Sequence, residues 1–156
     1  MQTYTGKTIN QKDRIGIVVA HFNQLVTECL LKGALDELKK YGVTDDQLTV
    51  IWVPGAMELS RAAKLLGTSG QVDGIIALGA VIKGQTDHYQ YVCSETASGL
   101  SSLSLSGPVP VMFGVLTTDN LDQAINRAGG KGGNKGAECA SGLLEMLGMQ
   151  RWLKAL

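Results

Sequence analysis

The sequence alternates between short apolar runs and segments with apolar residues at helical spacing, and this alternation strongly constrains the fold. Four short apolar runs are predicted to be strands: Ile15–Ala20, Leu48–Val53, Val72–Leu78 and Val111–Val115. The continuous run Ile15–Ala20 is typical of a strand covered on both faces, and the β-branched run Val72–Leu78 of a buried strand. After each run, apolar residues recur three and four positions apart, which is typical of a helix packed on one side. The chain is therefore expected to form a parallel sheet with helices on both faces, in three α/β/α layers.

The ends of these segments are marked by glycine, proline and capping residues. The first predicted helix contains Leu31, Ala34, Leu35 and Leu38 and ends before Gly42. The second spans Met57–Leu66, and the third runs from about His88 to Ser104. The fourth contains Leu121, Ala124, Ile125 and Arg127 after a cap at Thr118 or Asp119, and the last runs from about Ala137 to Leu153. Residues 1–13 are polar and are predicted to form an N-terminal arm outside the core. Without a repeat or a long linker, residues 1–156 are expected to form one domain.

Composition argues against several classes of protein. Lysine plus arginine and aspartate plus glutamate both number 14, so the net charge is zero and a nucleic-acid-binding surface is not expected. No run approaches the roughly 20 apolar residues of a membrane span, and the polar N-terminus lacks a secretion signal. Cys29, Cys93 and Cys139 lie far apart in helical patterns, which predicts buried free thiols, no metal site and a reducing cytoplasm.

The segment after the third predicted strand has the composition of a ligand-binding turn. Gly79 is expected to end the strand, Gly84 to permit a tight turn and Thr86 to cap the next helix. Free amides at that helix start, together with Lys83, suit a phosphorylated substrate. His88, in the first helical turn, is the residue able to move a proton near neutral pH. Loops of this composition also commonly connect a strand to a helix without binding a ligand, so these residues alone leave the function open.

Three other loops are expected at the same edge, because ligands of parallel α/β folds bind outside the carboxyl ends of the strands. They contain His21–Asn23, Pro54–Glu58 and Phe113–Asp119. The two phenylalanines, Phe22 and Phe113, fit a stacking platform for a flat heterocycle and equally fit ordinary core packing. Glu58 could accept a hydrogen bond from a ligand or simply favour the dipole of its helix.

The glycine-rich run Gly129–Gly136 is not predicted to bind a nucleoside triphosphate. It lacks a Gly-Lys-Ser/Thr sequence and follows a helix, so a link between helices is expected. Arg127, close to Lys131 and Lys135, is either a solvated surface charge or a bidentate phosphate ligand. Cys93 lies five residues from His88, which is poor helical register for a nucleophile and its base.

Taken together, the motifs resemble the lumazine synthase family from about Arg14 to the C-terminal helix. The resemblance is carried by Phe22-Asn23, Trp52–Ala56 with Glu58, Leu78-Gly79, Val81-Ile82, Gly84, Thr86, His88, Phe113–Thr118, Arg127–Gly129 and Gly133–Gly136. It implies a flavodoxin-like fold with a four-stranded parallel sheet, in which the N-terminal arm adds to a neighbouring subunit's sheet. Members form homopentamers, and in many bacteria twelve pentamers form an icosahedral shell. Riboflavin synthase is a candidate partner enclosed by such a shell. The sequence leaves the choice between pentamer and shell open.

The resemblance also implies an activity and roles for individual residues. The family condenses 5-amino-6-(D-ribitylamino)uracil with 3,4-dihydroxy-2-butanone 4-phosphate, without cofactor or metal, to 6,7-dimethyl-8-ribityllumazine, phosphate and water. This is the penultimate step of riboflavin biosynthesis. By this resemblance, Phe22 would stack on the pyrimidine, Ala56, Met57 and Glu58 would contact the ribityl side, and Ala80, Val81 and Ile82 would contact the ring. Gln85, Thr86 and Arg127 would bind the phosphate, and Lys135 would assist near it. His88 would transfer protons. Phe113 and Arg127 are expected from the adjacent subunit.

The chain departs from the family pattern at four positions. Met57 replaces an aromatic residue, Ser60 a proline, Ala80 a threonine and Lys83 an arginine. Loss of the threonine hydroxyl removes one substrate contact, and lysine keeps the charge of arginine but not its fork geometry. The alternatives are a non-catalytic flavin- or lumazine-binding shell protein and a flavodoxin-type electron carrier. The first is disfavoured because His88 and Arg127 are kept, and the second because no Ser/Thr-rich phosphate loop follows the first strand.

Overall fold

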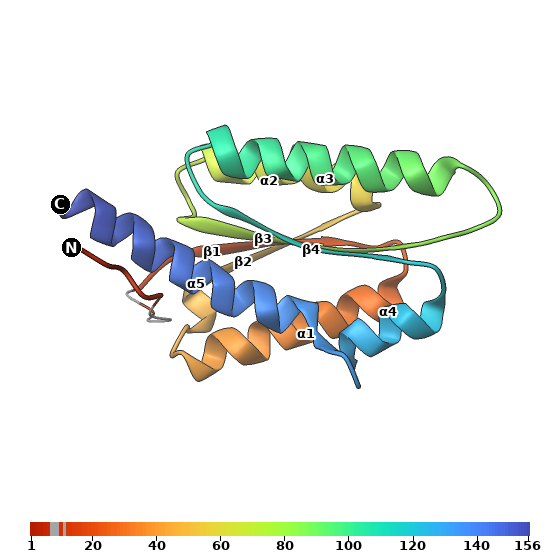
Figure 1. Ribbon diagram of the computed structural model, residues 1–156, viewed down its shortest axis with the longest axis horizontal. Helices are drawn as coiled ribbons and strands as arrows, with labels where there is room; N and C mark the ends of the chain where they lie inside the picture. The colour runs from red at the N-terminus through yellow and green to blue at the C-terminus, as the bar shows by residue number, and fades with distance from the viewer. Residues whose placement is uncertain (7–9, 11) are drawn as a thin grey trace.

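The computed structural model describes residues 1–6, 10 and 12–156 and contains a four-stranded sheet between two layers of helices (Figure 1). The strands are β1 (Ile15–Ala20), β2 (Leu48–Val53), β3 (Gly74–Ile82) and β4 (Val111–Thr118). Their order is β2-β1-β3-β4, and all neighbouring pairs are parallel. The predicted three-layer parallel α/β fold is confirmed.

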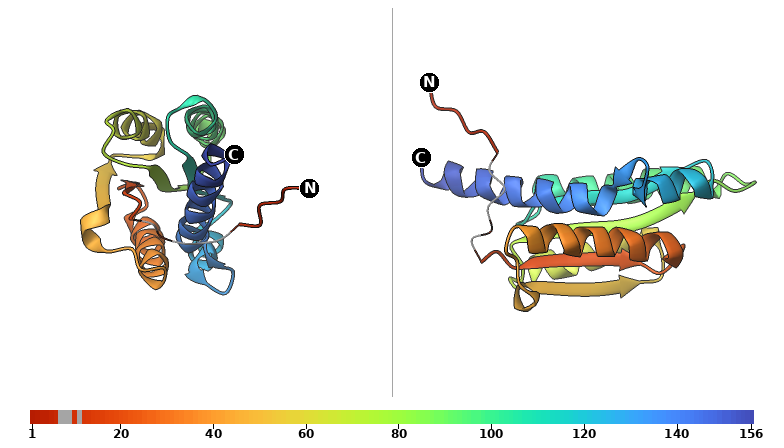
Figure 2. Two further views of the ribbon diagram at one scale, coloured as in Figure 1. Left: turned by 90° about the vertical axis from the view of Figure 1, so that its left-hand side faces the viewer. Right: turned by 90° about the horizontal axis from the view of Figure 1, so that it is seen from below.

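The helices divide between the two faces of the sheet, as the end-on view in Figure 2 shows. One face carries α1 (Gln24–Lys40), α4 (Leu121–Arg127) and α5 (Lys135–Lys154), and the other carries α2 (Ala56–Thr68) and α3 (His88–Ser106). A short 3₁₀ helix, Asp45–Gln47, precedes β2. The two termini lie at one end of the molecule, opposite the carboxyl ends of the strands (Figure 1).

Two apolar cores, one on each side of the sheet, explain why the central strands are uniformly hydrophobic. Every residue of β1 is buried, and so are the first seven residues of β3. Leu30, Leu38 and Leu143 pack on one face, while Leu59 and Leu100 pack on the other. Full burial of each such side chain stabilises the fold by roughly 1.5–3 kcal/mol.

The expectation that Gly79 ends the third strand is wrong. β3 continues to Ile82, and Gly79 pairs with Val115 of β4 inside the sheet. A Cβ atom at Gly79 would lie 3.1 Å from Leu59 Cδ1, so this glycine permits close packing of α2 on the sheet rather than a turn. β4 is likewise longer than predicted and ends at Thr118.

Two predicted helix caps are also replaced by neighbouring residues. Asp87, not Thr86, occupies the cap position of α3, and it makes no side-chain capping hydrogen bond. Asn120, not Thr118 or Asp119, caps α4 by accepting a hydrogen bond of 2.9 Å from the Gln123 amide.

The glycine-rich link is more regular than expected. Ala128–Gly130 and Gly133–Asn134 pair as the short antiparallel strands β5 and β6, and α5 begins immediately afterwards at Lys135. The cysteines lie in helices as predicted and are free, but only Cys139 is buried; Cys29 is exposed and Cys93 is half-buried.

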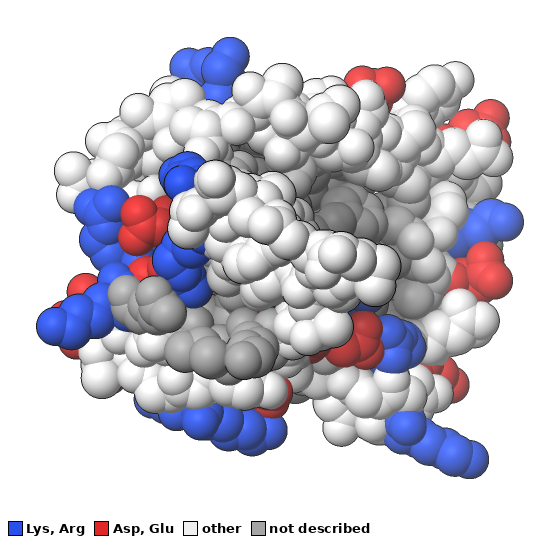
Figure 3. All heavy atoms as spheres, turned by 60° about the vertical axis from the view of Figure 1, so that its left-hand side comes forward, with Lys and Arg blue, Asp and Glu red and all other residues white. Residues whose placement is uncertain are grey.

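Two residues of the N-terminal arm, Tyr4 and Asp13, contact the C-terminal helix of the same chain. The ring centroids of Tyr4 and Trp152 lie 5.7 Å apart, and Asp13 pairs with Arg151. Residues 7–9 and 11 of the predicted arm lie outside the described residues. In the part of the chain that is described, no helix is long and apolar enough to cross a membrane. Figure 3 shows acidic and basic side chains interspersed on one face of the molecule.

Candidate active site

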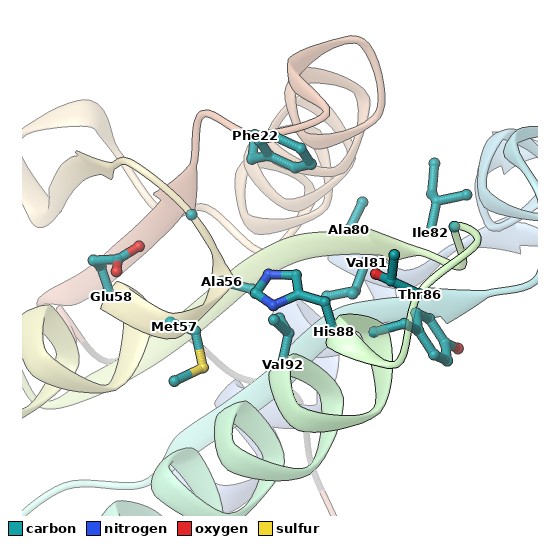
Figure 4. Close-up of a pocket in the computed structure, with 13 residues that line it drawn as sticks. Phe22, Ala56, Met57, Glu58, Ala80, Val81, Ile82, Thr86, His88 and Val92 are labelled. Atoms are coloured by element: carbon teal, nitrogen blue, oxygen red, sulfur yellow. The ribbon is translucent and has the colours of Figure 1, made fainter.

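A cavity of about 440 Å³ lies at the carboxyl ends of β1 and β3, next to the starts of α2 and α3. This volume falls within the usual range for small-molecule sites. The walls are mainly apolar and carry few polar groups (Figure 4). The lining residues are Phe22, Gly55, Ala56, Met57, Glu58, Ala80, Val81, Ile82, Gly84, Thr86, His88, Tyr89 and Val92.

One wall is the loop between β1 and α1. The amides of His21 and Phe22 donate to the carbonyl oxygens of Val53 and Pro54, at 2.8 and 3.0 Å, which joins this loop to the end of β2. The His21 ring stacks on Trp52, with ring centroids 4.8 Å apart. Phe22 is left 71% exposed, so it is a surface aromatic at the cavity and not a core residue.

The start of α2 forms a second wall. The backbone of Gly55 is extended at the cap position, and Ala56 begins the helix. Met57 is 47% exposed, and Glu58 is the acidic residue of the first turn. Ala56 is buried, so of these three residues Met57 and Glu58 present the more accessible side chains.

The last residues of β3 and the first turn of α3 complete the cavity. Ala80 is buried, and Val81 and Ile82 are half-buried. His88 is the first residue of α3 and is exposed; its imidazole extends toward the start of α2, with Phe22 across the cavity (Figure 4). The histidine therefore reaches the space where the walls from three different elements meet.

Tyr89 and Val92 line the cavity and were not identified from the sequence. Burial, followed by the hydrogen bond with Cys93, raises the pKa of the Tyr89 phenol, and a hydrogen bond with Thr117 acts in the opposite direction. Tyr89 is therefore neutral near pH 7. Helical spacing could have indicated Val92, which lies four positions, about one turn, after His88. Tyr89 lies three positions before Val92, on the same helix face.

The structure brings together nine of the thirteen residues predicted for the site and leaves four outside this cavity. The four are Gln85, Phe113, Arg127 and Lys135. Gln85 is exposed in the loop before α3. Phe113 lies on β4, 38% exposed, and lines a separate groove with residues of α3.

Arg127 and Lys135 lie on either side of the β5–β6 hairpin. Arg127 ends α4 and Lys135 begins α5, and both pair with Glu138, at 2.9 and 3.1 Å. The two cations share one carboxylate, and none of the three residues lines the cavity. Among the described residues, no group of three or more His, Cys, Asp or Glu side chains could hold a metal ion.

The fold and the cavity together define an α/β protein with a candidate small-molecule site at the carboxyl edge of a parallel sheet. Comparison with known proteins identifies the family within this class, since the model of the 6,7-dimethyl-8-ribityllumazine synthase family matches residues 12–151. The chain belongs to the 6,7-dimethyl-8-ribityllumazine synthase family.

Relatives match over nearly the full length of the chain. The 6,7-dimethyl-8-ribityllumazine synthase of Levilactobacillus brevis is 54% identical over 156 residues, covering 100% of this chain and 99% of the relative. That of Pediococcus pentosaceus is 52% identical over 151 residues, covering 97% of both chains. The predicted resemblance is confirmed.

Proposed function

We propose that this chain is a transferase that condenses 5-amino-6-(D-ribitylamino)uracil with 3,4-dihydroxy-2-butanone 4-phosphate. The products are 6,7-dimethyl-8-ribityllumazine, inorganic phosphate and water, in the penultimate step of riboflavin biosynthesis. The observation that carries the proposal is the cavity of this family member, in which Phe22 and His88 flank the end of β3. We propose one domain, residues 1–156, as the folding unit.

The apolar part of the cavity suits the uracil. Phe22 offers an exposed ring for stacking on a flat heterocycle. Ala80, Val81 and Ile82 would contact the ring edge, and Glu58, with Ala56 and Met57, would face the ribityl chain. Because position 80 carries no hydroxyl, any polar contact there has to come from the main chain.

The second substrate carries a phosphate and needs an anion site. We assign its phosphate to Gln85 and Thr86 beside His88, together with the cations Arg127 and Lys135. The loop residues are exposed and precede a helix N-terminus, where amides and the helix dipole favour anions. Arg127 and Lys135 do not line the cavity of their own chain.

This separation supports a homo-oligomeric enzyme whose sites are shared between subunits. Phe113 and Arg127 would reach the cavity of an adjacent copy, and Phe113 is exposed on a strand edge as such a role requires. Tyr91 and Leu105 on α3 are 69% and 89% exposed, which suits a face covered by another copy. We propose a homopentamer, with a shell of twelve pentamers around riboflavin synthase as the larger assembly, and the free cysteines support a cytoplasmic location.

The proposed chemistry needs proton transfers and no metal. The uracil amine attacks the butanone carbonyl, and loss of water gives an imine. Phosphate is then eliminated, tautomerisation gives a second carbonyl, and attack of the ribityl-bearing nitrogen on that carbonyl closes the ring with loss of a second water. His88 is the group in the cavity able to give and take a proton near neutral pH. Holding the two substrates together supplies a large part of the remaining acceleration.

The test is to mix the purified protein with both substrates and measure the lumazine and the phosphate released. The proposal predicts equal amounts of the two products, formed faster than without protein and only when both substrates are present. Tight binding of lumazine or riboflavin with no faster product formation would contradict catalysis and favour the flavin-binding shell protein.

A further inference from the structure

Arg127 and Lys135 share one carboxylate, that of Glu138. Arg127 Nη2 lies 2.9 Å from Glu138 Oε1, and Lys135 Nζ lies 3.1 Å from Glu138 Oε2, so each oxygen accepts from a different cation. Arg127 is the last residue of α4, whereas Lys135 and Glu138 lie in the first turn of α5. Glu138 therefore connects cations from two separate elements.

The backbone around this cluster restrains the arginine. Arg127 Nη1 donates a hydrogen bond to the carbonyl oxygen of Gly132. Gly133 has a positive φ of 84°, and a Cβ atom there would lie 3.8 Å from both Arg127 Nη1 and Glu138 Oε1. The hairpin thus passes close behind the guanidinium, which leaves its remaining donors directed at Glu138 or at a ligand.

Hydrogen bonds hold the first turn of α5, which carries Lys135 and Glu138, in place. Asn134 caps the helix, accepting a hydrogen bond of 3.1 Å from the Ala137 amide, and its Nδ2 donates to the Cys29 carbonyl oxygen at 2.9 Å. These bonds join the α5 start to α1. Glu138 can therefore hold the long Arg127 side chain against a rigid part of the molecule.

Stability of the fold does not explain this arrangement. The side chains of Arg127, Glu138 and Lys135 are 40%, 45% and 35% exposed, and ion pairs of this exposure contribute little to folding. Burial raises the pKa of the Glu138 carboxyl, but hydrogen bonds from Lys135 and Arg127 outweigh it, and the pKa lies below its ordinary value. The carboxylate is therefore charged at neutral pH.

We propose that Glu138 is a positioning residue for the phosphate site: it holds Arg127 and Lys135 together, ready for the phosphate of the second substrate. This inference rests on the proposed function for the assignment of the two cations. Two cations side by side repel each other, and the carboxylate between them offsets this repulsion and orders both side chains. A phosphate then binds donors that are already in place, at a lower cost in side-chain entropy.

The test compares the parent with Glu138→Gln, which keeps the shape of the side chain and removes its charge. Inorganic phosphate is the probe, and its Kd is measured by ³¹P NMR, which needs no turnover. We expect phosphate to bind about tenfold more weakly to the variant, as loss of a charge-assisted hydrogen bond predicts. Glu145→Gln, which removes another exposed carboxylate of α5, is the matched control and should leave the Kd unchanged.

Kinetics then separate positioning from a general structural role. In Glu138→Gln, the KM for the butanone phosphate should rise about tenfold, while the KM for the uracil and kcat at saturation stay the same. In an Arg127→Ala background, Glu138→Gln should have a much smaller effect, because the residue acts through the arginine.

An unchanged or tighter phosphate Kd in Glu138→Gln would overturn the inference. A tighter Kd would mean that the carboxylate competes with phosphate instead of preparing the site. A parent that forms lumazine while the variant behaves identically rejects the role of Glu138 and leaves the proposed function intact. A parent that binds phosphate but forms no lumazine rejects the function, and the phosphate Kd still decides the role of Glu138.

Discussion

The side-chain amide of Asn23 donates a hydrogen bond of 2.8 Å to the carbonyl oxygen of Ala80. Asn23 precedes α1 in the left-handed conformation, with φ 59° and ψ 45°, and its own carbonyl oxygen accepts hydrogen bonds from the amides of Val26 and Thr27. The bond therefore joins the loop that carries Phe22 to the end of β3. Two walls of the cavity are held together by one residue that does not line it.

Substitution of Asn23 should separate its two contributions. Asn23→Gly keeps the left-handed backbone and loses the bond to Ala80, at a cost of about 1 kcal/mol. Asn23→Ala loses the bond and adds backbone strain of about 1 kcal/mol. Chemical denaturation should therefore rank the parent above Asn23→Gly and Asn23→Gly above Asn23→Ala. Equal stability of the two variants would contradict the strain argument.

Phe22 should affect binding without affecting folding. Because its ring is 71% exposed, Phe22→Ala should change the free energy of unfolding by no more than about 0.5 kcal/mol. Loss of the stacking surface should raise the KM for the uracil about tenfold. Leu25→Ala is the matched control, since Leu25 is 68% exposed at the start of α1. A similar rise in KM for Leu25→Ala would mean that stacking is not the cause.

The sequence predicted the layers of the fold because strand-like and helical periodicities alternate without ambiguity. It also predicted the loops at the carboxyl edge, since parallel strands place their ends together. Local capping was less predictable. Asn120 and Thr118 are both good capping residues two positions apart, and only the Asn120–Gln123 hydrogen bond of the folded chain decides between them. The prediction that Gly79 ends the strand failed because the sequence does not distinguish two uses of glycine. One kind of glycine makes room for a side chain of a neighbouring helix, as Gly79 does for Leu59, and the other allows the chain to turn.

Features that depend on contacts between distant segments could not be predicted. The Asn23–Ala80 bond spans 57 positions, and the pairing of Arg127 with Glu138 requires the hairpin to bring α4 and α5 together. Cys29 follows a helical pattern similar to that of Cys139, but it lies on the outward side of α1. Phe113 and Arg127 lie outside the cavity of this chain, and it was the family resemblance, not the spacing of the residues, that led us to expect them from an adjacent subunit.

Close packing of α1 on α5 should make Gly136 intolerant of a side chain. A Cβ atom there would overlap the carbonyl oxygen of Leu30, whereas at Gly142 of the same helix it would meet only the flexible tip of Met112, at 2.8 Å. We expect Gly136→Ala to destabilise the protein by about 3 kcal/mol and Gly142→Ala by less than about 1 kcal/mol. Thermal denaturation of the two variants tests the difference; a milder effect at position 136 than at 142 would refute it.

The three cysteines should differ in reactivity. Burial raises the pKa of the Cys139 thiol to about 11, so it is protonated and inaccessible at pH 8, whereas Cys29 is exposed. Iodoacetamide followed by mass mapping should modify Cys29 first and Cys139 only after unfolding. Because the folded thiol holds its proton more tightly than the unfolded one, its contribution to stability should be lost as the pH rises from about 9 to about 11. Early modification of Cys139 in the folded protein would show that its site is open.

The central claim is that the cavity between Phe22 and His88 catalyses lumazine formation, and one absorbance measurement tests it. The parent, His88→Ala and a reaction without protein are compared at saturating concentrations of both substrates. We predict faster product formation by the parent and a kcat lower by about 10²-fold in His88→Ala, with substrate binding retained, because the proton-transfer group is lost. A His88→Ala variant as fast as the parent, or a parent no faster than the spontaneous reaction, would contradict the account.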